Sequence, residues 1–165
     1  MKKKIVLMCL CVSYTCFLCA QEKYDYTNIN KLVDKIVNNS KTVEESIKNY
    51  GQPLSVRTTS AQDYAPNAFE DAVMLFHKYK NAEFLFFISE KNHKHFLMAW
   101  VITGDFAYFS PLLSNNMTIN DVKKIFGENI AVPTEDGLLY GLDGGDVSFE
   151  FVDDYLVHIS WLVEG

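Results

Sequence analysis

The same short helix pattern occurs twice in the chain, 76 residues apart, and this repetition limits which folds the chain can adopt. Each copy begins with a threonine, has an acidic residue three positions later and ends nine positions later with a glycine. This spacing predicts a capping box at a helix N-terminus and a left-handed glycine stop at its end. The aligned pairs are Thr42 and Thr118, Glu45 and Asp121, Tyr50 and Phe126, and Gly51 and Gly127.

Runs typical of β-strands follow both predicted helices. After the first helix they span 73–80, 83–89 and 96–103, and after the second they span 138–142, 147–152 and 155–163. A polar segment, 57–71, reads as an extended loop before the first set. Alignment of the two sets pairs Phe76 with Tyr140 and, at an offset of 59, Phe96 with Tyr155 and Trp100 with Ile159.

The chain therefore reads as an α+β protein built from a tandem repeat of a helix plus an antiparallel β-meander, with helices packed on one face of the sheet. The repeats span about 27–103 and 117–165, joined by a linker at 104–116, within a single domain at 21–165. The first repeat opens with an amphipathic helix over 28–37, for which Thr27 or Asn28 is the expected cap.

Residues 1–20 are predicted to be a secretory signal peptide. Lys2, Lys3 and Lys4 precede an apolar run at 5–19, and Ala20 marks the expected cleavage site. All four cysteines of the chain lie in this segment, so no disulfide is expected in the exported protein. The expected location is periplasmic or secreted. A lipoprotein is disfavoured because large residues precede Cys16 and Cys19.

The charge of residues 21–165 limits the partners. This part of the chain has 12 basic and 21 acidic residues, a formal charge of −9, because the three lysines near the start are removed. Nucleic acid is not an expected partner, because phosphate binding needs a basic surface. No second apolar run approaches membrane-spanning length, so no transmembrane segment is expected in 21–165.

The order of capped helix, glycine stop and meander, carried by 42–51 and 118–127, resembles the β-lactamase inhibitory protein family. More loosely it resembles the small lipoprotein of the outer-membrane barrel-assembly machine, which has one such unit. The resemblance covers nearly all of 21–165 and implies a non-enzymatic protein-binding surface on the sheet face opposite the helices. This chain differs from the inhibitors in having no cysteine after residue 20, and from the assembly lipoproteins in lacking their N-terminal lipidated cysteine.

No pattern in the sequence predicts catalytic residues, a metal or a cofactor. His93 and His95 could ligate zinc, but a structural site needs four ligands, and the surrounding composition is typical of a hairpin tip. The acidic residues Asp143, Asp146, Asp153 and Asp154 do not follow the order of a calcium loop and are read as two turns. His158 with Ser148 or Ser160 could be imagined as a hydrolytic triad, but no serine lies in a nucleophile-elbow sequence.

The two predicted sheets differ in their outward-facing residues. The second alternates apolar with polar residues: Val147, Phe149, Phe151, Tyr155, Val157, Ile159 and Trp161 are expected inward, and Ser148, Glu150, His158 and Ser160 outward, with Leu156 as an exception. In the first, the outward positions are apolar as well, and the residues expected inward are Phe84, Phe86, Ile88, Phe96, Met98, Trp100 and Ile102. The outward residues Leu85, Phe87, Leu97 and Val101 are therefore a candidate partner-binding surface. The alternative is that the loop at 57–71 or the linker covers this face.

Together these patterns predict an exported, non-enzymatic protein-binding or inhibitor-like module of the cell envelope or extracellular space, with a protein partner. An envelope structural or assembly factor is the alternative. A hydrolase without a recognisable motif is a third and weaker one.

Overall fold

The computed structural model describes residues 24–163, which form a mixed helix and strand protein. The predicted signal peptide and the four cysteines lie outside these residues. Within the described part of the chain, no helix is both long and apolar enough to cross a membrane.

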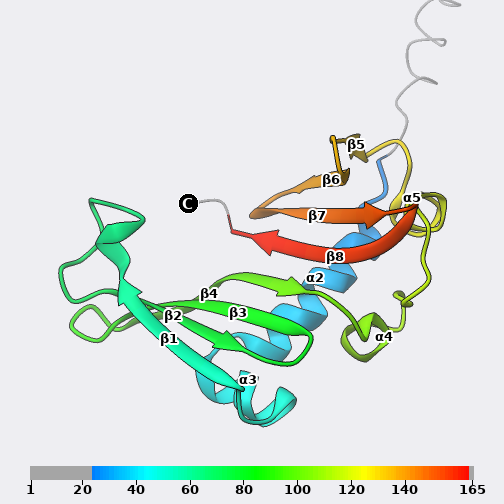
Figure 1. The fold of residues 1–165 in the computed structure, drawn as a ribbon. Coiled ribbons are helices and arrows are strands. Elements are labelled where there is room, and N and C mark those ends of the chain that lie inside the picture. The colour runs from blue at the N-terminus through cyan, green and yellow to red at the C-terminus, as the bar shows by residue number, and fades with distance from the viewer. Residues whose placement is uncertain (1–23, 164–165) are drawn as a thin grey trace, which may run out of the picture.

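All eight strands of the described region form one antiparallel sheet, with three α-helices of eight or more residues beside it (Figure 1). In chain order the elements are α2 (Thr27–Ser40), α3 (Val43–Tyr50), β1 (Ser55–Ser60), the 3₁₀ turn η1 (Ala61–Asp63), β2 (Val73–Lys78), β3 (Ala82–Ser89), β4 (Lys94–Ile102), α4 (Phe106–Phe109), α5 (Ile119–Phe126), β5 (Val132–Pro133), β6 (Gly137–Leu142), β7 (Gly145–Val152) and β8 (Tyr155–Leu162).

The sheet consists of two meanders joined at their last strands. The strand order is β1-β2-β3-β4-β8-β7-β6-β5, so each group of four follows the chain and the two groups meet at β4 and β8. These two strands pair over only four residues each, from Ala99 opposite Leu162 to Ile102 opposite Ile159. We call the two groups the β1–β4 half and the β5–β8 half.

The predicted capping boxes are present at both short helices. The Thr42 hydroxyl accepts from the Glu45 N–H at 3.2 Å, and the Glu45 carboxylate accepts from the Thr42 N–H at 3.2 Å. At α5 the Thr118 and Asp121 side chains make the same pair of contacts, at 3.3 and 2.9 Å. The glycines that end these helices have positive φ values, 82° at Gly51 and 105° at Gly127.

The first helix, α2, is longer than predicted and has a different cap. Thr27 and Asn28 lie inside it, and the Asp25 carboxylate instead accepts from the Thr27 N–H at 2.9 Å. The Asn28 side-chain amide donates to the Ile125 carbonyl at 2.7 Å, which ties α2 to α5.

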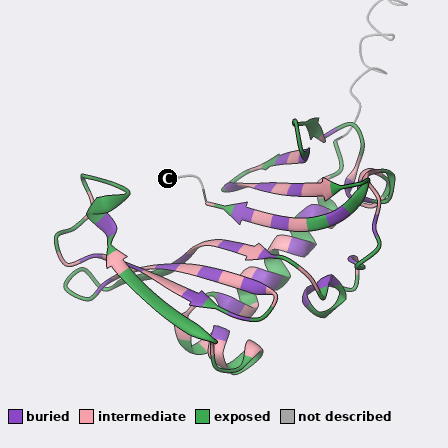
Figure 2. Cartoon of the chain, in the orientation of Figure 1, coloured by how far each residue is buried: buried purple, intermediate pink, exposed green. Residues whose placement is uncertain are grey.

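Most of the hydrophobic core lies between the helices and one face of the sheet, which we call the inner face (Figure 2). The helices contribute Ile29, Leu32, Ile36, Val122 and Phe126, and the strands contribute Phe84, Phe86, Trp100, Ile102, Leu138, Tyr140, Val147, Phe149, Ile159 and Trp161. Both halves of the sheet supply this core, so the described chain packs as one body.

Two segments predicted to be irregular contain short elements. The polar segment 57–71 begins in β1, an exposed edge strand with little apolar alternation, and then forms η1. The predicted linker 104–116 contains α4, which buries Phe106 and Phe109 in the main core.

A β-bulge lies in each half and reverses the predicted side-chain directions beyond it. Between β3 and β4 the register shifts so that Phe86 pairs with Leu97, which leaves Met98 as the extra residue. Between β7 and β8 Phe151 pairs with Leu156, which leaves Val157 as the extra residue. The two extra residues are 59 positions apart, the offset that aligns the last strands. A one-residue shift moves side chains to the other face of a strand.

Candidate functional site

The outer face, opposite the helices, carries a second apolar cluster on the β1–β4 half. Its members are Met74, Phe76, Leu85, Phe87 and Met98, and we call them the outer cluster. Leu85 and Phe87 were predicted to face outward, and they do. The sheet of this half is therefore apolar on both faces, which is unusual for an antiparallel sheet with one solvated side.

The prediction for Leu97 is wrong. The bulge at Met98 turns Leu97 inward, where it is 6% exposed and belongs to the main core. The same bulge turns Phe96 outward, where its ring stacks on Phe87 with centroids 5.1 Å apart. Val101 lies opposite Glu83 and Ser160 on the outer face and is partly buried. Of the four predicted partner residues, three thus lie on the outer face, and Phe96 replaces the fourth.

The segment 61–72 covers part of the outer cluster. Ala61, Ala68 and Ala72 pack against the cluster, and the Tyr64 ring lies 6.3 Å from that of Phe76. From β1 the Arg57 guanidinium lies 3.7 Å above the Phe76 ring, within the range of a cation–π interaction. The expected alternative, that the chain covers its own outer face, therefore holds in part.

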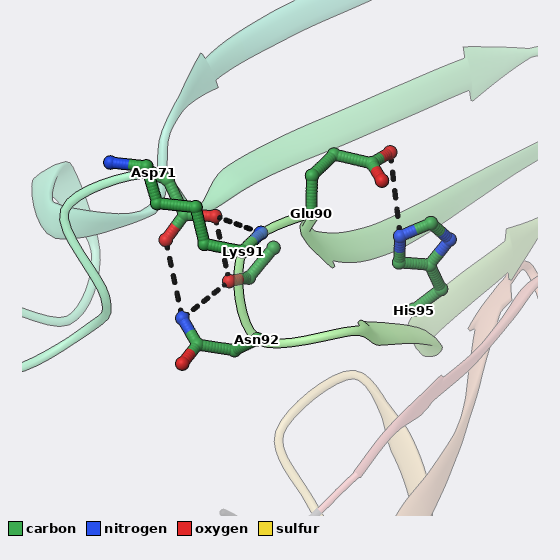
Figure 3. Close-up of polar contacts among 6 residues, drawn as sticks. Asp71, Glu90, Lys91, Asn92 and His95 are labelled. Atoms are coloured by element: carbon green, nitrogen blue, oxygen red, sulfur yellow. Dashed lines mark hydrogen bonds and ion pairs between the residues drawn. The ribbon is translucent and has the colours of Figure 1, made fainter.

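Asp71 anchors the end of this covering segment to the turn between β3 and β4 (Figure 3). Its carboxylate accepts hydrogen bonds from the Ser89 hydroxyl at 2.9 Å, the Lys91 N–H at 2.9 Å and the Asn92 side-chain amide at 3.3 Å. These donors, first the Lys91 N–H and then the Ser89 hydroxyl, lower the pKa of Asp71. The charged carboxylate thus holds the covering segment on the sheet.

Large apolar side chains remain exposed around this cover. Phe96 is 40% exposed, and Leu162 is 57% exposed at the position opposite Ala99 on the same face. The covering segment itself presents two exposed aromatic rings, Tyr64 and Phe69. The outer face of the β1–β4 half thus offers a combination of a partly buried apolar floor and exposed aromatic rings.

The outer face of the β5–β8 half is polar at its centre. Ser148 pairs with Ser160 and Glu150 pairs with His158, and the Glu150 carboxylate lies 3.1 Å from His158 Nδ1. The expected inward direction of Tyr155 and Val157 is wrong, because the bulge turns both outward and turns Leu156 into the core. The apparent exception in the sequence, Leu156, is thereby explained.

The other sequence candidates lie in turns or lack a partner for chemistry. His93 is in the β3–β4 turn, and His95 is the second residue of β4, where it pairs with Glu90 at 3.4 Å (Figure 3). The four aspartates divide between the β6–β7 and β7–β8 hairpins, and the described residues contain no group of three or more His, Cys, Asp or Glu placed to hold a metal. His158 Nε2 has no hydrogen-bond partner among the described residues, so it is not hydrogen-bonded to either nearby serine.

A cavity of about 520 Å³, not predicted from the sequence, opens between α3, α4 and the turn that joins β2 to β3, and its lining includes Leu54, which lies just before β1. Its apolar wall includes Tyr50, whose ring stacks on Phe84 with centroids 5.0 Å apart, and the Tyr108 ring of α4. Burial raises the pKa of Tyr50 to about 12. The Tyr79 hydroxyl lies 3.2 Å from Ser46 Oγ. The one sequence signal for this cavity was the group of aromatic residues in the predicted linker, Phe106, Tyr108 and Phe109, to which no role was assigned.

No known protein family, curated protein or solved structure matches the chain.

Proposed function

We propose that the chain is a non-enzymatic protein-binding module, and that a protein partner contacts the outer face of the β1–β4 half. The supporting observation is the apolar outer cluster together with the exposed rings around it, on a face that does not build the main core. Exposed apolar surface of this kind is typical of interaction sites, and aromatic anchors dominate interface energetics. We also propose export to the periplasm or beyond, based on the lysines and apolar run of residues 1–20.

The proposal includes a tandem repeat similar in fold to the β-lactamase inhibitory protein. Each half consists of a capped short helix ending in a positive-φ glycine, followed by a four-stranded meander. The two bulges, at the aligned residues Met98 and Val157, support the same relation. Two copies of one unit would explain why two distant segments share caps, register and bulge. An envelope assembly factor would use the same surface in a permanent complex.

Phe96 and Tyr155 provide a matched test, because they occupy aligned outer positions in the two halves. Phe96→Asp should weaken partner capture from envelope extract by about tenfold or more, since burying a phenylalanine is worth about 1.5 to 3 kcal/mol and 1.4 kcal/mol is a factor of ten. Tyr155→Asp should leave capture unchanged. The free energy of unfolding of each variant, measured with urea, should lie within about 0.5 kcal/mol of the wild-type value, as is usual for surface positions.

Equal capture by the wild-type protein and Phe96→Asp would contradict the proposal, as would equal losses in the two variants. The hydrolase alternative makes a different prediction. Turnover on a panel of simple esters or glycosides, abolished by His158→Ala, would replace the binding proposal with an enzymatic one.

A further inference from the structure

The β1 edge of the sheet has unpaired backbone groups. In the described region β1 pairs only with β2, without a register shift. Just beyond β1, the Ala61 N–H donates to the Ala72 carbonyl at 2.9 Å, in the same register. Because backbone groups in an antiparallel ladder point alternately toward and away from the neighbouring strand, the N–H and C=O groups of Val56, Thr58 and Ser60 point away from β2. The backbone groups of these three residues are therefore available to pair with an added strand.

The two edges of the sheet are not equally protected. At the far edge, β5 has two residues, and one of them is Pro133. Short strands and prolines are the usual ways in which natural proteins block edge pairing. The six residues of β1 include no proline and no lysine or acidic residue. Its single charged residue, Arg57, is turned over the Phe76 ring on the outer face and does not stand along the edge.

The apolar cavity adjoins the start of this edge. Leu54, one residue before β1, is 73% exposed and lines the cavity, together with Tyr108, which is 63% exposed. Val56 pairs with His77, whose ring contacts Phe86 of the main core, so Val56 faces the helix side of the sheet and is 55% exposed there. Two exposed apolar side chains, Leu54 and Val56, therefore lie at the start of the edge, and Leu54 is part of the cavity wall.

We propose that the β1 edge binds an extended segment of a partner protein by strand addition. The residues of that segment that hydrogen-bond to Val56 and Thr58 share their face, because directly paired residues point to the same side. That face leads to Leu54 and the cavity, so these residues are apolar, and one large side chain enters the cavity. The intervening residues face the outer side beside Arg57, where an acidic residue complements the guanidinium. In strand addition the main chain supplies affinity, and pockets for alternate side chains supply specificity.

This inference is independent of the outer-face proposal, because it uses a different surface. A phage library of random nine-residue peptides is selected on the purified wild-type protein, and enriched peptides are synthesised for fluorescence anisotropy. Enriched peptides should alternate apolar and polar residues, with an acid among the polar ones. Phe96→Asp, on the outer face, should bind them like the wild-type protein.

Thr58→Pro is the deciding variant. Proline is tolerated at an edge position whose N–H faces solvent, so the fold should survive, as thermal unfolding would verify. The proline removes one donor of the free ladder and should weaken peptide binding by about tenfold or more, whereas Thr58→Ala, which keeps the N–H, should bind normally. Peptides N-methylated at the apolar positions should lose binding in the same way.

Three results would overturn the inference. The first is that no peptide is enriched. The second is that the enriched peptides lack the alternation, or that they bind Thr58→Pro within about twofold of the wild-type affinity. The third is that the wild-type protein is a dimer without peptide and that Thr58→Pro is a monomer. The last result, read by sedimentation velocity, would assign the edge to a second copy of this chain.

Discussion

The two halves of the sheet are alike on the inner face and different on the outer face. Inward, Phe84 and Phe149 are both completely buried at corresponding register positions. Outward, three corresponding pairs at the centre of the face change from apolar to polar: Leu85 to Glu150, Ala99 to His158, and Val101 to Ser160. The shared core explains the inner residues, because both halves must pack against the same helices.

This difference indicates which residues the fold does not require. An outer face that is polar at its centre is compatible with a well-packed half, as β5–β8 demonstrates with Glu150, His158 and two serines beside the exposed Tyr155 and Val157. The apolar outer face of β1–β4 therefore needs a separate explanation, and the covering segment 61–72 accounts for only part of it. We propose that a partner contacts the exposed remainder.

The largest expected effect concerns the shared inner face. Phe84→Ala and Phe149→Ala should each lower the free energy of unfolding by about 3 to 5 kcal/mol, because each removes a fully buried aromatic ring and leaves a cavity. Urea unfolding followed by tryptophan fluorescence measures both, since Trp100 and Trp161 lie in the same core. A loss at one position of less than half that at the other would break the equivalence of the two inner faces.

The next effect concerns the helix ends. Gly51→Ala and Gly127→Ala should each destabilise the protein by about 1 to 3 kcal/mol, because an alanine side chain is strained at a positive φ. The loss should be larger at Gly127, where a Cβ would lie 3.2 Å from Ile130 Cγ1, than at Gly51, where it would meet no atom within 4 Å. Urea midpoints of the two variants test this order. Stability unchanged in either variant would indicate that its helix end is not fixed as the structure has it.

Features that depend on neighbouring residues in the sequence were predicted well. The capping boxes and glycine stops follow from a few residues each, and the structure has both. The strands that build the inner face were also placed closely, because apolar alternation there is enforced by the main core. β1 was missed, since an exposed edge strand such as Ser55–Ser60 needs no apolar alternation.

The candidate site was predicted only in part, because its residues depend on a bulge. One extra residue in β4 exchanges the faces of Leu97 and Phe96, and alternation alone places both on the wrong side. The sequence contained one signal of this, the exceptional Leu156 at the aligned position of the second half. The alignment of Phe76 with Tyr140 also fails, because Phe76 lies in the outer cluster and Tyr140 lies in the core.

The smallest expected effect concerns His77. It corresponds to the buried Leu138 of the other half, because His77 pairs with Phe84 and Leu138 pairs with Phe149. His77 is buried beside the Phe86 and Tyr79 rings, and burial lowers its pKa. Below the ordinary histidine pKa of about 6.5 the unfolded chain therefore binds a proton that the folded protein does not. Stability should be complete above this pH and decline as the pH falls through it.

His77→Leu should remove this component, because leucine fits the aligned position and does not titrate. Between pH 7.5 and 5.0 the urea midpoint of the wild-type protein should fall more than that of His77→Leu. Equal declines in wild-type protein and His77→Leu would show that His77 is accommodated in its charged form. In that case the inner face of the β1–β4 half would hold a charged side chain where the β5–β8 half has the uncharged Leu138. The contrast between the halves would then extend from the outer face to the inner face.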